Sequence, residues 1–294
     1  PVDRDRLQEA VDLVVVRHAT LRTVFVEGPD GPRQCVLGRM AVPVGTGFDD
    51  GPFDIERGPL LRIALREEGD GRRLDLLFHH IVADLWSVGV FMAELSDLYA
   101  GIAPPPLRID FGDHVAAEAE RLSEPEMAAR RGFWTDRLLG ADLTLDLGAG
   151  DGPSDLAAAS RVARRRLPED FVARLRAGGE SLGCAPFAIL FAVFAAMLHG
   201  RSGARRFPLG VPVANRGRAG SERLIGDFAD IRLVVPEVDP EKSGRALVAA
   251  AGEALDMAAH HELPFAETAG LIRSLRTDPS LLPLQACCTY TRQA

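Results

Sequence analysis

Two adjacent histidines and a nearby aspartate make residues 74–99 the segment best suited to chemistry. The segment reads LDLLFHHIVADLWSVGVFMAELSDLY, with His79 and His80 ending an alternating run and Asp84 four residues after His80. Histidine exchanges a proton near neutral pH, so one imidazole held in place can act as an acid or a base. The pattern predicts proton transfer at one of the two histidines.

Strand alternation separates the two imidazoles. Neighbouring side chains of a strand point to opposite faces, so His80 shares a face with Leu76 and Phe78, and His79 lies on the other face. We expect His80 to enter an apolar layer. A structural role for the segment is equally well supported, with strand-end histidines beside an aspartate, Asp84, that caps the next helix.

A metal site is not predicted here. Two histidines on opposite faces of a strand cannot both bind one ion, and no third ligand stands at a convincing spacing. The sequence also lacks a GxSxG nucleophile elbow and a cysteine in a nucleophile context.

A second polar segment, VPVANRG at residues 211–217, lies at a predicted strand-to-loop junction. Asn215 is the only asparagine of the chain, and its side chain can fix a turn. The neighbouring Arg216 can form a bidentate pair with a carboxylate. A turn followed by a surface arginine explains the segment equally simply when it is taken alone.

Composition indicates a globular protein that binds neither nucleic acid nor membrane. The chain has 294 residues and a net charge of −8, whereas nucleic-acid binding needs a basic surface. The four cysteines have no CxxC spacing, which fits a reducing cytoplasm. The longest apolar run, residues 186–199, is too short to span a bilayer and predicts a buried helix.

The first half of the chain predicts a helix, two hairpins and further helices. The helix covers residues 5–18, and turn-forming residues GPDGP and EEGDG predict hairpins around positions 28–32 and 67–71. Asp84 or Ser87 caps the helix that follows the histidines. One or two surface helices are expected over residues 110–139, with Phe133 and Trp134 as anchors.

The second half alternates strands and helices. Strands are predicted at 161–168, 206–216, 230–238 and 281–291, and helices at 168–183, 185–199, 241–261 and 264–275. The glycine-rich stretch 140–160 predicts a linker, so the lobes are placed at 1–150 and 151–294. The alternation indicates an α/β or mixed-sheet sandwich.

Six ordered blocks resemble the condensation domains of nonribosomal peptide synthetases. They are RHATLRTVF (17–25), GPLLRIAL (58–65), HHIVADLWS (79–87), GVPVANR (210–216), IGDFADIRLVV (225–235) and HHELPFAE (260–267). The resemblance covers nearly the whole chain. It implies two α/β lobes, each similar to chloramphenicol acetyltransferase, which form a pseudo-dimer with a tunnel between them.

The resemblance also implies an acyltransferase of antibiotic or other secondary metabolism. An upstream carrier protein presents an acyl or peptidyl thioester, and the amine of an aminoacyl thioester on a downstream carrier attacks it to form an amide. Both substrates ride on phosphopantetheine arms, and no cofactor is bound by the domain itself. Carrier proteins and an adjacent adenylation domain are the expected partners, in the cytoplasm.

The resemblance implies roles for the residues of this chain that match the motifs of the family. His80 matches the catalytic histidine, which orients the amine, removes its proton, or both, and His79 matches the supporting one. Asp84 matches a residue that pairs with the arginine at Arg216, beside Asn215. Three residues, Leu85, Trp86 and Ser87, continue the turn that shapes the tunnel near the reacting carbonyl.

The chain departs from the family pattern at two positions and at both ends. Leu85 stands where glycine is usual, which bears on the donor pocket, and Asp230 replaces an asparagine. The first family motif and the last strands are missing, which indicates a partial domain. Two alternatives remain: an acyltransferase of the same superfamily that uses a free alcohol or amine, and a catalytically silent domain that recruits carriers or enzymes.

Overall fold

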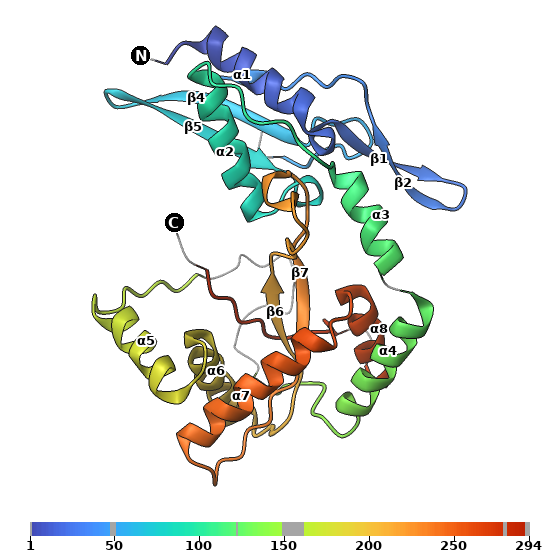
Figure 1. The fold of residues 1–294 in the computed structure, drawn as a ribbon, viewed down its shortest axis with the longest axis vertical. Helices are drawn as coiled ribbons and strands as arrows, with labels where there is room; N and C mark the ends of the chain where they lie inside the picture. The colour runs from blue at the N-terminus through green and yellow to red at the C-terminus, as the bar shows by residue number, and fades with distance from the viewer. Residues whose placement is uncertain (1, 48–50, 122, 149–161, 279–280, 292–294) are drawn as a thin grey trace. The chain divides into compact units, whose positions relative to one another are not determined.

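The structure is a computed structural model that describes residues 2–47, 51–121, 123–148, 162–278 and 281–291. By compactness the chain divides into a first unit, Pro1–Leu122 with Ala214–Ala229, and a second unit, Ser123–Val213 with Asp230–Ala294 (Figure 1). The predicted lobe boundary at residue 150 lies outside the described residues and stays a prediction.

Helix α1 (Arg4–Arg17) opens the first unit where the apolar spacing predicts it. Asp3 caps the helix, since its carboxylate accepts hydrogen bonds from the backbone N–H groups of Asp5 at 3.0 Å and Arg6 at 3.1 Å. One face of α1 is buried and carries Leu7, Ala10, Val11, Val14 and Val15, whereas Leu13 and Val16 are exposed. A cap and one continuous apolar stripe are what a surface helix needs.

Both predicted hairpins of the first unit are present. The strands are β1 (Thr23–Gly28), β2 (Gly31–Val36), β3 (Val44–Gly45), β4 (Leu61–Glu68) and β5 (Gly71–Phe78). Gly31 has φ +112° and Gly69 has φ +58°, so each hairpin turns through a conformation that favours glycine. β3 pairs in parallel with β4, and β4 pairs antiparallel with β5, which places Leu61 opposite Phe78.

Helix α2 (Leu85–Tyr99) packs beside α1 over this sheet (Figure 1). Helix α3 (Phe111–Arg121) completes the helices of the first unit. The core contains buried apolar side chains from α1, the sheet, α2 and the returning loop: Leu7, Val11, Val14, Val15, Leu61, Ile63, Phe91, Leu95 and Ile225. The loop of residues 214–229 is therefore part of this core.

A buried charged cluster joins the end of α1 to α2. The Glu94 carboxylate lies 3.0 Å from Arg17 Nε and 2.8 Å from His18 Nε2, and the side chains of Glu94 and His18 are 9% and 2% exposed. Burial alone would raise the pKa of Glu94. Hydrogen bonding and charge attraction from His18 and Arg17 outweigh burial and hold that pKa below its ordinary value.

Replacing Glu94 with Gln should therefore destabilise the first unit by about 3 kcal/mol, because buried His18 and partly buried Arg17 lose their carboxylate. Glu68→Gln is the control: Glu68 is 62% exposed and pairs with exposed Arg73, so we expect less than about 1 kcal/mol. Urea denaturation measures both variants. An E94Q protein as stable as E68Q would contradict the cluster's role.

The same cluster gives stability a pH dependence of known sign. A carboxylate whose pKa is lowered on folding stabilises above its unfolded value, here 4.5, and the stabilisation is lost as pH falls through the folded value. Wild-type protein should therefore lose stability below about pH 4.5 more steeply than E94Q.

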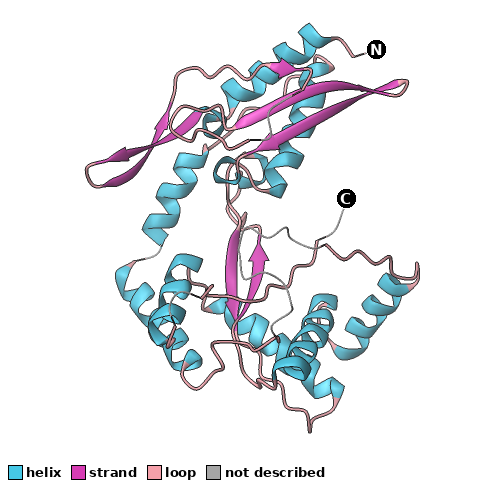
Figure 2. Cartoon of the chain, turned by 180° about the vertical axis from the view of Figure 1, so that it is seen from behind, coloured by secondary structure: helices cyan, strands magenta, loops and turns pink. Residues whose placement is uncertain are grey.

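The second unit contains a strand pair surrounded by helices (Figure 2). The elements are α4 (Glu124–Leu138), α5 (Phe171–Leu182), α6 (Pro186–Ser202), β6 (Leu209–Val213), β7 (Asp230–Val234), α7 (Gly244–His260) and α8 (Phe265–Leu275). β6 and β7 are antiparallel, with Leu209 opposite Val234. The predicted anchor Trp134 is 2% exposed, and its Nε1 donates to the His261 carbonyl at 2.7 Å.

Two predicted strands are not formed. Residues 162–168 make no ladder, and Val162 is 73% exposed, so this arginine-rich stretch lacks the apolar burial that would stabilise a strand. Residues 281–291 make a single parallel bridge, between Cys287 and Gly210, where a strand was expected.

None of the described helices alone has the length and apolar composition to cross a bilayer. Helices α5 and α6 meet the criterion only when joined, and the chain bends by 96° between them.

Candidate active site

The histidine segment lies where β5 ends in the first unit. His79 N–H donates to the Leu60 carbonyl at 2.9 Å as the last bond beside β4, and a 3-10 turn (His80–Val82) follows. The His79 ring caps that turn, since its Nδ1 accepts from the Ile81 N–H at 3.1 Å. The ring also meets the edge of Phe53, with centroids 5.7 Å apart. These contacts give His79 a supporting position.

His80 is exposed, which corrects the prediction that its imidazole enters an apolar layer. Its side chain is 75% exposed. Strand alternation stops at Phe78, and the 3-10 turn then directs His80 away from the face of Leu76 and Phe78. The imidazole at the end of this segment is therefore open to solvent.

Asp84 and Arg216 form a buried ion pair. Arg216 Nη2 lies 2.9 Å from Asp84 Oδ1, and the two side chains are 4% and 5% exposed. Asp84 also caps α2, because Oδ1 accepts from the Ser87 N–H at 2.7 Å. Its Oδ2 accepts from the Phe228 N–H at 3.3 Å. One carboxylate thus fixes the start of α2 against the returning loop.

Ser87 is the second link between α2 and that loop. Its hydroxyl lies 2.7 Å from Asp84 Oδ1 and 2.8 Å from the Gly226 carbonyl, and it accepts from the Gly226 N–H at 3.0 Å and from Arg216 at 2.8 Å. A hydroxyl has one proton, so it donates to one of the two oxygens at a time. Ser87, predicted as a turn-shaping residue, is fully buried in this network.

The two Nη1 donors of Arg216 hold the loop itself. Nη1 donates to the carbonyls of Ser221 at 2.6 Å and Leu224 at 2.8 Å. The guanidinium also lies 3.9 Å from the centre of the Phe228 ring, a cation–π distance. Burial lowers the pKa of Arg216 and the Asp84 charge raises it, but a guanidinium stays protonated in either case.

The other predicted site residues surround this network. Asn215 has φ +47°, the left-handed backbone that asparagine tolerates better than most residues, so its conformation lets the chain turn into Arg216. Leu85 and Trp86, in the first turn of α2, are 77% and 50% exposed. Trp86 Nε1 donates to the Glu222 carbonyl at 3.0 Å. The structure thus groups all the predicted site residues within the first unit.

Asp227 is a polar contact of His80 that the sequence analysis missed. Its Oδ2 lies 3.3 Å from His80 Nδ1. The available signal was an acidic residue directly after a glycine in the IGDFAD block, the block in which Asp230 departs from the family pattern. Asp230 belongs to the second unit and lies next to α8, because its Oδ1 accepts from the Phe265 N–H at 3.3 Å. Burial raises the pKa of Asp230.

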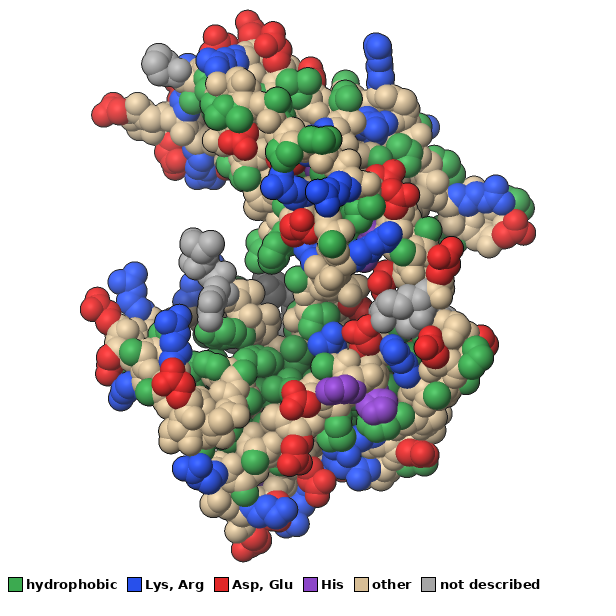
Figure 3. Space-filling view, viewed as in Figure 1, with side chains coloured by type: hydrophobic (Ala, Val, Ile, Leu, Met, Phe, Trp, Pro, Cys, Tyr) green, Lys and Arg blue, Asp and Glu red, His purple; other side chains and the backbone are tan. Residues whose placement is uncertain are grey.

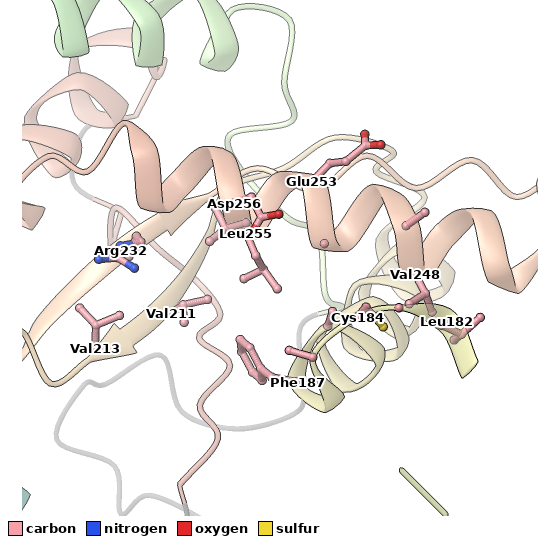
Figure 4. A pocket seen from close by; sticks show the side chains of 16 residues that line it. Leu182, Cys184, Phe187, Val211, Val213, Arg232, Val248, Glu253, Leu255 and Asp256 are labelled. Carbon is pink, nitrogen blue, oxygen red and sulfur yellow. The ribbon is translucent and has the colours of Figure 1, made fainter. Parts of the chain in front are cut away.

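The second unit holds a separate pocket of about 610 Å³ (Figure 4). Apolar side chains from α6, β6, β7 and α7 line it, among them Phe187, Val211 and Leu255, and Arg232 lies at its edge. No predicted site residue lines it. Within the described ranges, no three His, Cys, Asp or Glu side chains are placed to hold one metal ion. On the face drawn in Figure 3, acidic and basic side chains are interspersed.

Comparison with known sequences gives a family match. The model of the condensation-domain family matches residues 49–281. Phosphinothricin tripeptide synthetases PhsC and PhsB of Streptomyces viridochromogenes are 33% and 34% identical, over 94% and 96% of this chain. The chain spans only 28% and 26% of those two proteins. Malpibaldin synthetase of Mortierella alpina is 29% identical over 88% of the chain and 5% of its own length.

Solved structures share the fold. The first condensation domain of the calcium-dependent antibiotic synthetase has a TM-score of 0.77 at 23% identity, covering 99% of this chain and 74% of its own. The EpoB cyclization-docking bidomain of Sorangium cellulosum has 0.82 at 22%, covering 98% and 63%. The teicoplanin X-domain, solved in complex with OxyB, has 0.74 at 25%, covering 95% and 67%. The predicted α/β fold, similar to chloramphenicol acetyltransferase, is confirmed.

The buried pair should be the most sensitive point of the first unit. Arg216→Ala should lower its free energy of unfolding by about 3–5 kcal/mol, because Asp84 then remains buried without its counter-charge. Arg218→Ala is the matched control, since Arg218 is exposed and donates to the Asp113 carbonyl at 2.8 Å; less than about 1 kcal/mol is expected. Trp86 fluorescence in a Trp134→Phe background follows this unit alone.

A double-mutant cycle separates the pair from its surroundings. Asp84→Ala with Arg216→Ala should cost less than the sum of the single changes, because removing both charges leaves neither one unpaired. Additive losses, or an Arg216→Ala protein as stable as the Arg218→Ala control, would show that the ion pair does not brace the segment.

Proposed function

This chain belongs to the condensation-domain family, and from that membership we propose that it joins two carrier-bound substrates through an amide bond. Amide-bond formation in nonribosomal peptide synthesis is the general function of the family. In the proposed reaction, the upstream substrate is an acyl or peptidyl thioester. The downstream substrate is an aminoacyl thioester, and its free amine is the nucleophile.

His80 is the proposed catalytic residue. The amine nitrogen attacks the thioester carbonyl, a C–N bond forms, and the C–S bond breaks. The amine gives up a proton to the His80 imidazole, and the departing thiolate takes up that proton, which restores the neutral imidazole. Positioned proton transfer of this kind contributes about 100- to 10,000-fold to a rate, and holding both tethered substrates together contributes the rest.

The observation that carries this proposal is the exposed imidazole of His80 close to the buried ion pair of Asp84 and Arg216, which is called the brace below. The His80 side chain is 75% exposed, while Asp84 and Arg216 are almost fully buried. A brace of this kind holds the turn that bears His80 without occupying the space where substrates approach. Its high desolvation cost is offset by the hydrogen bonds of Asp84, Ser87 and the loop carbonyls.

The start of α2 is the proposed site for the developing oxyanion. The N–H groups in the first turn of a helix carry a partial positive charge, so those of Leu85 and Trp86 can stabilise negative charge on the thioester oxygen. Leu85 occupies the position where the family usually has glycine, and its side chain is 77% exposed. We propose that this side chain limits which upstream acyl or peptidyl substrates the site accepts.

The proposed partners are the two carrier proteins that present these substrates. Each delivers its substrate on a phosphopantetheine arm, and the domain itself needs no bound cofactor in this scheme. An adenylation domain of the same synthetase loads the acceptor carrier.

Mass spectrometry of loaded carriers tests the proposal. Mixing the wild-type chain with an acyl-loaded donor carrier and an aminoacyl-loaded acceptor carrier should transfer the acyl group to the acceptor. His80→Ala should lower this rate at least about 100-fold, with stability within about 0.5 kcal/mol of wild type because the side chain is exposed.

His260→Ala is the matched control for the loss of an imidazole. His260 is exposed at the end of α7, where its Nδ1 lies 2.7 Å from the Asp256 carbonyl, and it should condense carriers at the wild-type rate. Undiminished condensation by folded His80→Ala would remove His80 from the mechanism.

Recruitment without catalysis is the second candidate. The X-domain was solved in complex with OxyB, so a domain of this fold can hold another protein. The Leu85 substitution lies in the same turn as the proposed oxyanion site. Tight carrier or enzyme binding by a wild-type chain that forms no product would favour recruitment, and transfer to a free amine or alcohol would favour a stand-alone acyltransferase.

A further inference from the structure

We propose that Asp227 is a positioning residue that fixes the tautomer of His80. Its carboxylate holds the imidazole proton on Nδ1 and leaves the lone pair of Nε2 free to accept the proton of the attacking amine. The inference deepens the proposed function and rests on it for the identity of that amine. The pairing of the two side chains is a separate observation of the first unit.

The contacts of Asp227 indicate that one oxygen of its carboxylate is directed toward His80. Asp227 Oδ2 lies 3.3 Å from His80 Nδ1, while its other oxygen, Oδ1, is buried. Among the described residues, no donor lies within hydrogen-bonding distance of that Oδ1. A buried acceptor without a donor is costly and calls for an explanation, such as a role in catalysis. Its position beside the one imidazole proposed to act supplies that explanation.

The backbone on both sides of Asp227 is immobilised by the buried network. The Gly226 carbonyl accepts from the Asp84 N–H at 3.3 Å, and its N–H donates to the Ser87 hydroxyl at 3.0 Å. On the other side, the Phe228 N–H donates to Asp84 Oδ2 at 3.3 Å. The side chain between these anchors reaches His80, with Oδ2 3.3 Å from Nδ1. The Asp84–Arg216 pair therefore acts on His80 through Asp227.

Gly226 sets the position of the loop against α3. A Cβ atom at this position would lie 2.3 Å from the ring of Phe111, far inside van der Waals contact. A larger residue would push the loop outward and carry Asp227 with it. The glycine thus lets the loop approach closely enough to bring the carboxylate to His80.

The chemistry of the neutral imidazole explains why it matters that the Asp227 carboxylate faces Nδ1. One ring nitrogen carries a proton and the other carries a lone pair, and the neighbour of one nitrogen decides the state of both. A carboxylate can only accept, so it selects the Nδ1–H tautomer. When Nε2 takes the amine proton, the resulting imidazolium faces a carboxylate, and that charge pairing stabilises it.

The tautomer can be measured without any substrate. Two-bond ¹H–¹⁵N correlation spectra of the imidazole rings, recorded where the histidines are neutral, distinguish a protonated from an unprotonated nitrogen. The His80 signals are those missing from a His80→Gln variant. Wild-type protein should carry the proton on Nδ1, and Asp227→Asn should move it to Nε2, because the amide of asparagine can donate to Nδ1.

Asp239→Asn is the matched control. Asp239 has the same 33% exposure as Asp227 and pairs with Lys242 at 3.8 Å in the second unit. It should leave the His80 tautomer and the condensation rate unchanged. Asp227→Asn should lower kcat by about 10- to 100-fold, which is less than the loss expected when the general base itself is removed. The KM for the acceptor carrier should change by less than about twofold.

The outcomes separate the inference from the function on which it rests. A neutral His80 that carries its proton on Nε2 in wild-type protein overturns the inference, and so does an Asp227→Asn protein with wild-type kcat. If the wild-type chain condenses no carriers, the proposed function fails, and the tautomer measurement alone still decides the pairing.

Discussion

The buried ion pair of Asp84 and Arg216 is the constraint on which the first unit depends. Removing two charges from water costs several kcal/mol for each ion, and attraction alone offsets that cost only when the remaining polar atoms are satisfied. Here four of the five guanidinium donors have partners, and the Phe228 ring lies against the guanidinium. Every one of those contacts is made by α2, by its capping residue Asp84 or by the loop 214–229, so satisfying the charges also assembles the site.

The buried polar network and the exposed imidazole are separate parts of the first unit. Asp84, Ser87 and Arg216 are buried and their polar atoms are largely engaged with one another, whereas His80 is exposed and only its Nδ1 lies near a protein partner, Asp227. This buried network lies one turn of the chain away from the imidazole. The backbone around Asp227 connects the network to the imidazole. A substitution in the buried part can therefore change activity without touching a substrate.

Local rules of the sequence predicted the helices and hairpins well, because caps, apolar periodicity and turn residues act over a few positions. They failed at His80, where strand alternation was extended two residues past Phe78 into a 3-10 turn. The contact between Asp84 and Arg216, 132 positions apart, came from resemblance to a family and not from spacing. Asp227 was missed because its partner lies 147 positions away and neither residue marks the other.

The order of the loop in the chain has a consequence for biosynthesis. The ribosome makes Asp84 and then 132 further positions before Arg216 emerges, which at 5–20 residues per second takes roughly 7–26 s. During that interval the nascent chain holds the carboxylate of Asp84 without its counter-charge. Residues 214–229 can therefore dock on α2 only after residues 123–213, the first segment of the second unit, have been synthesised.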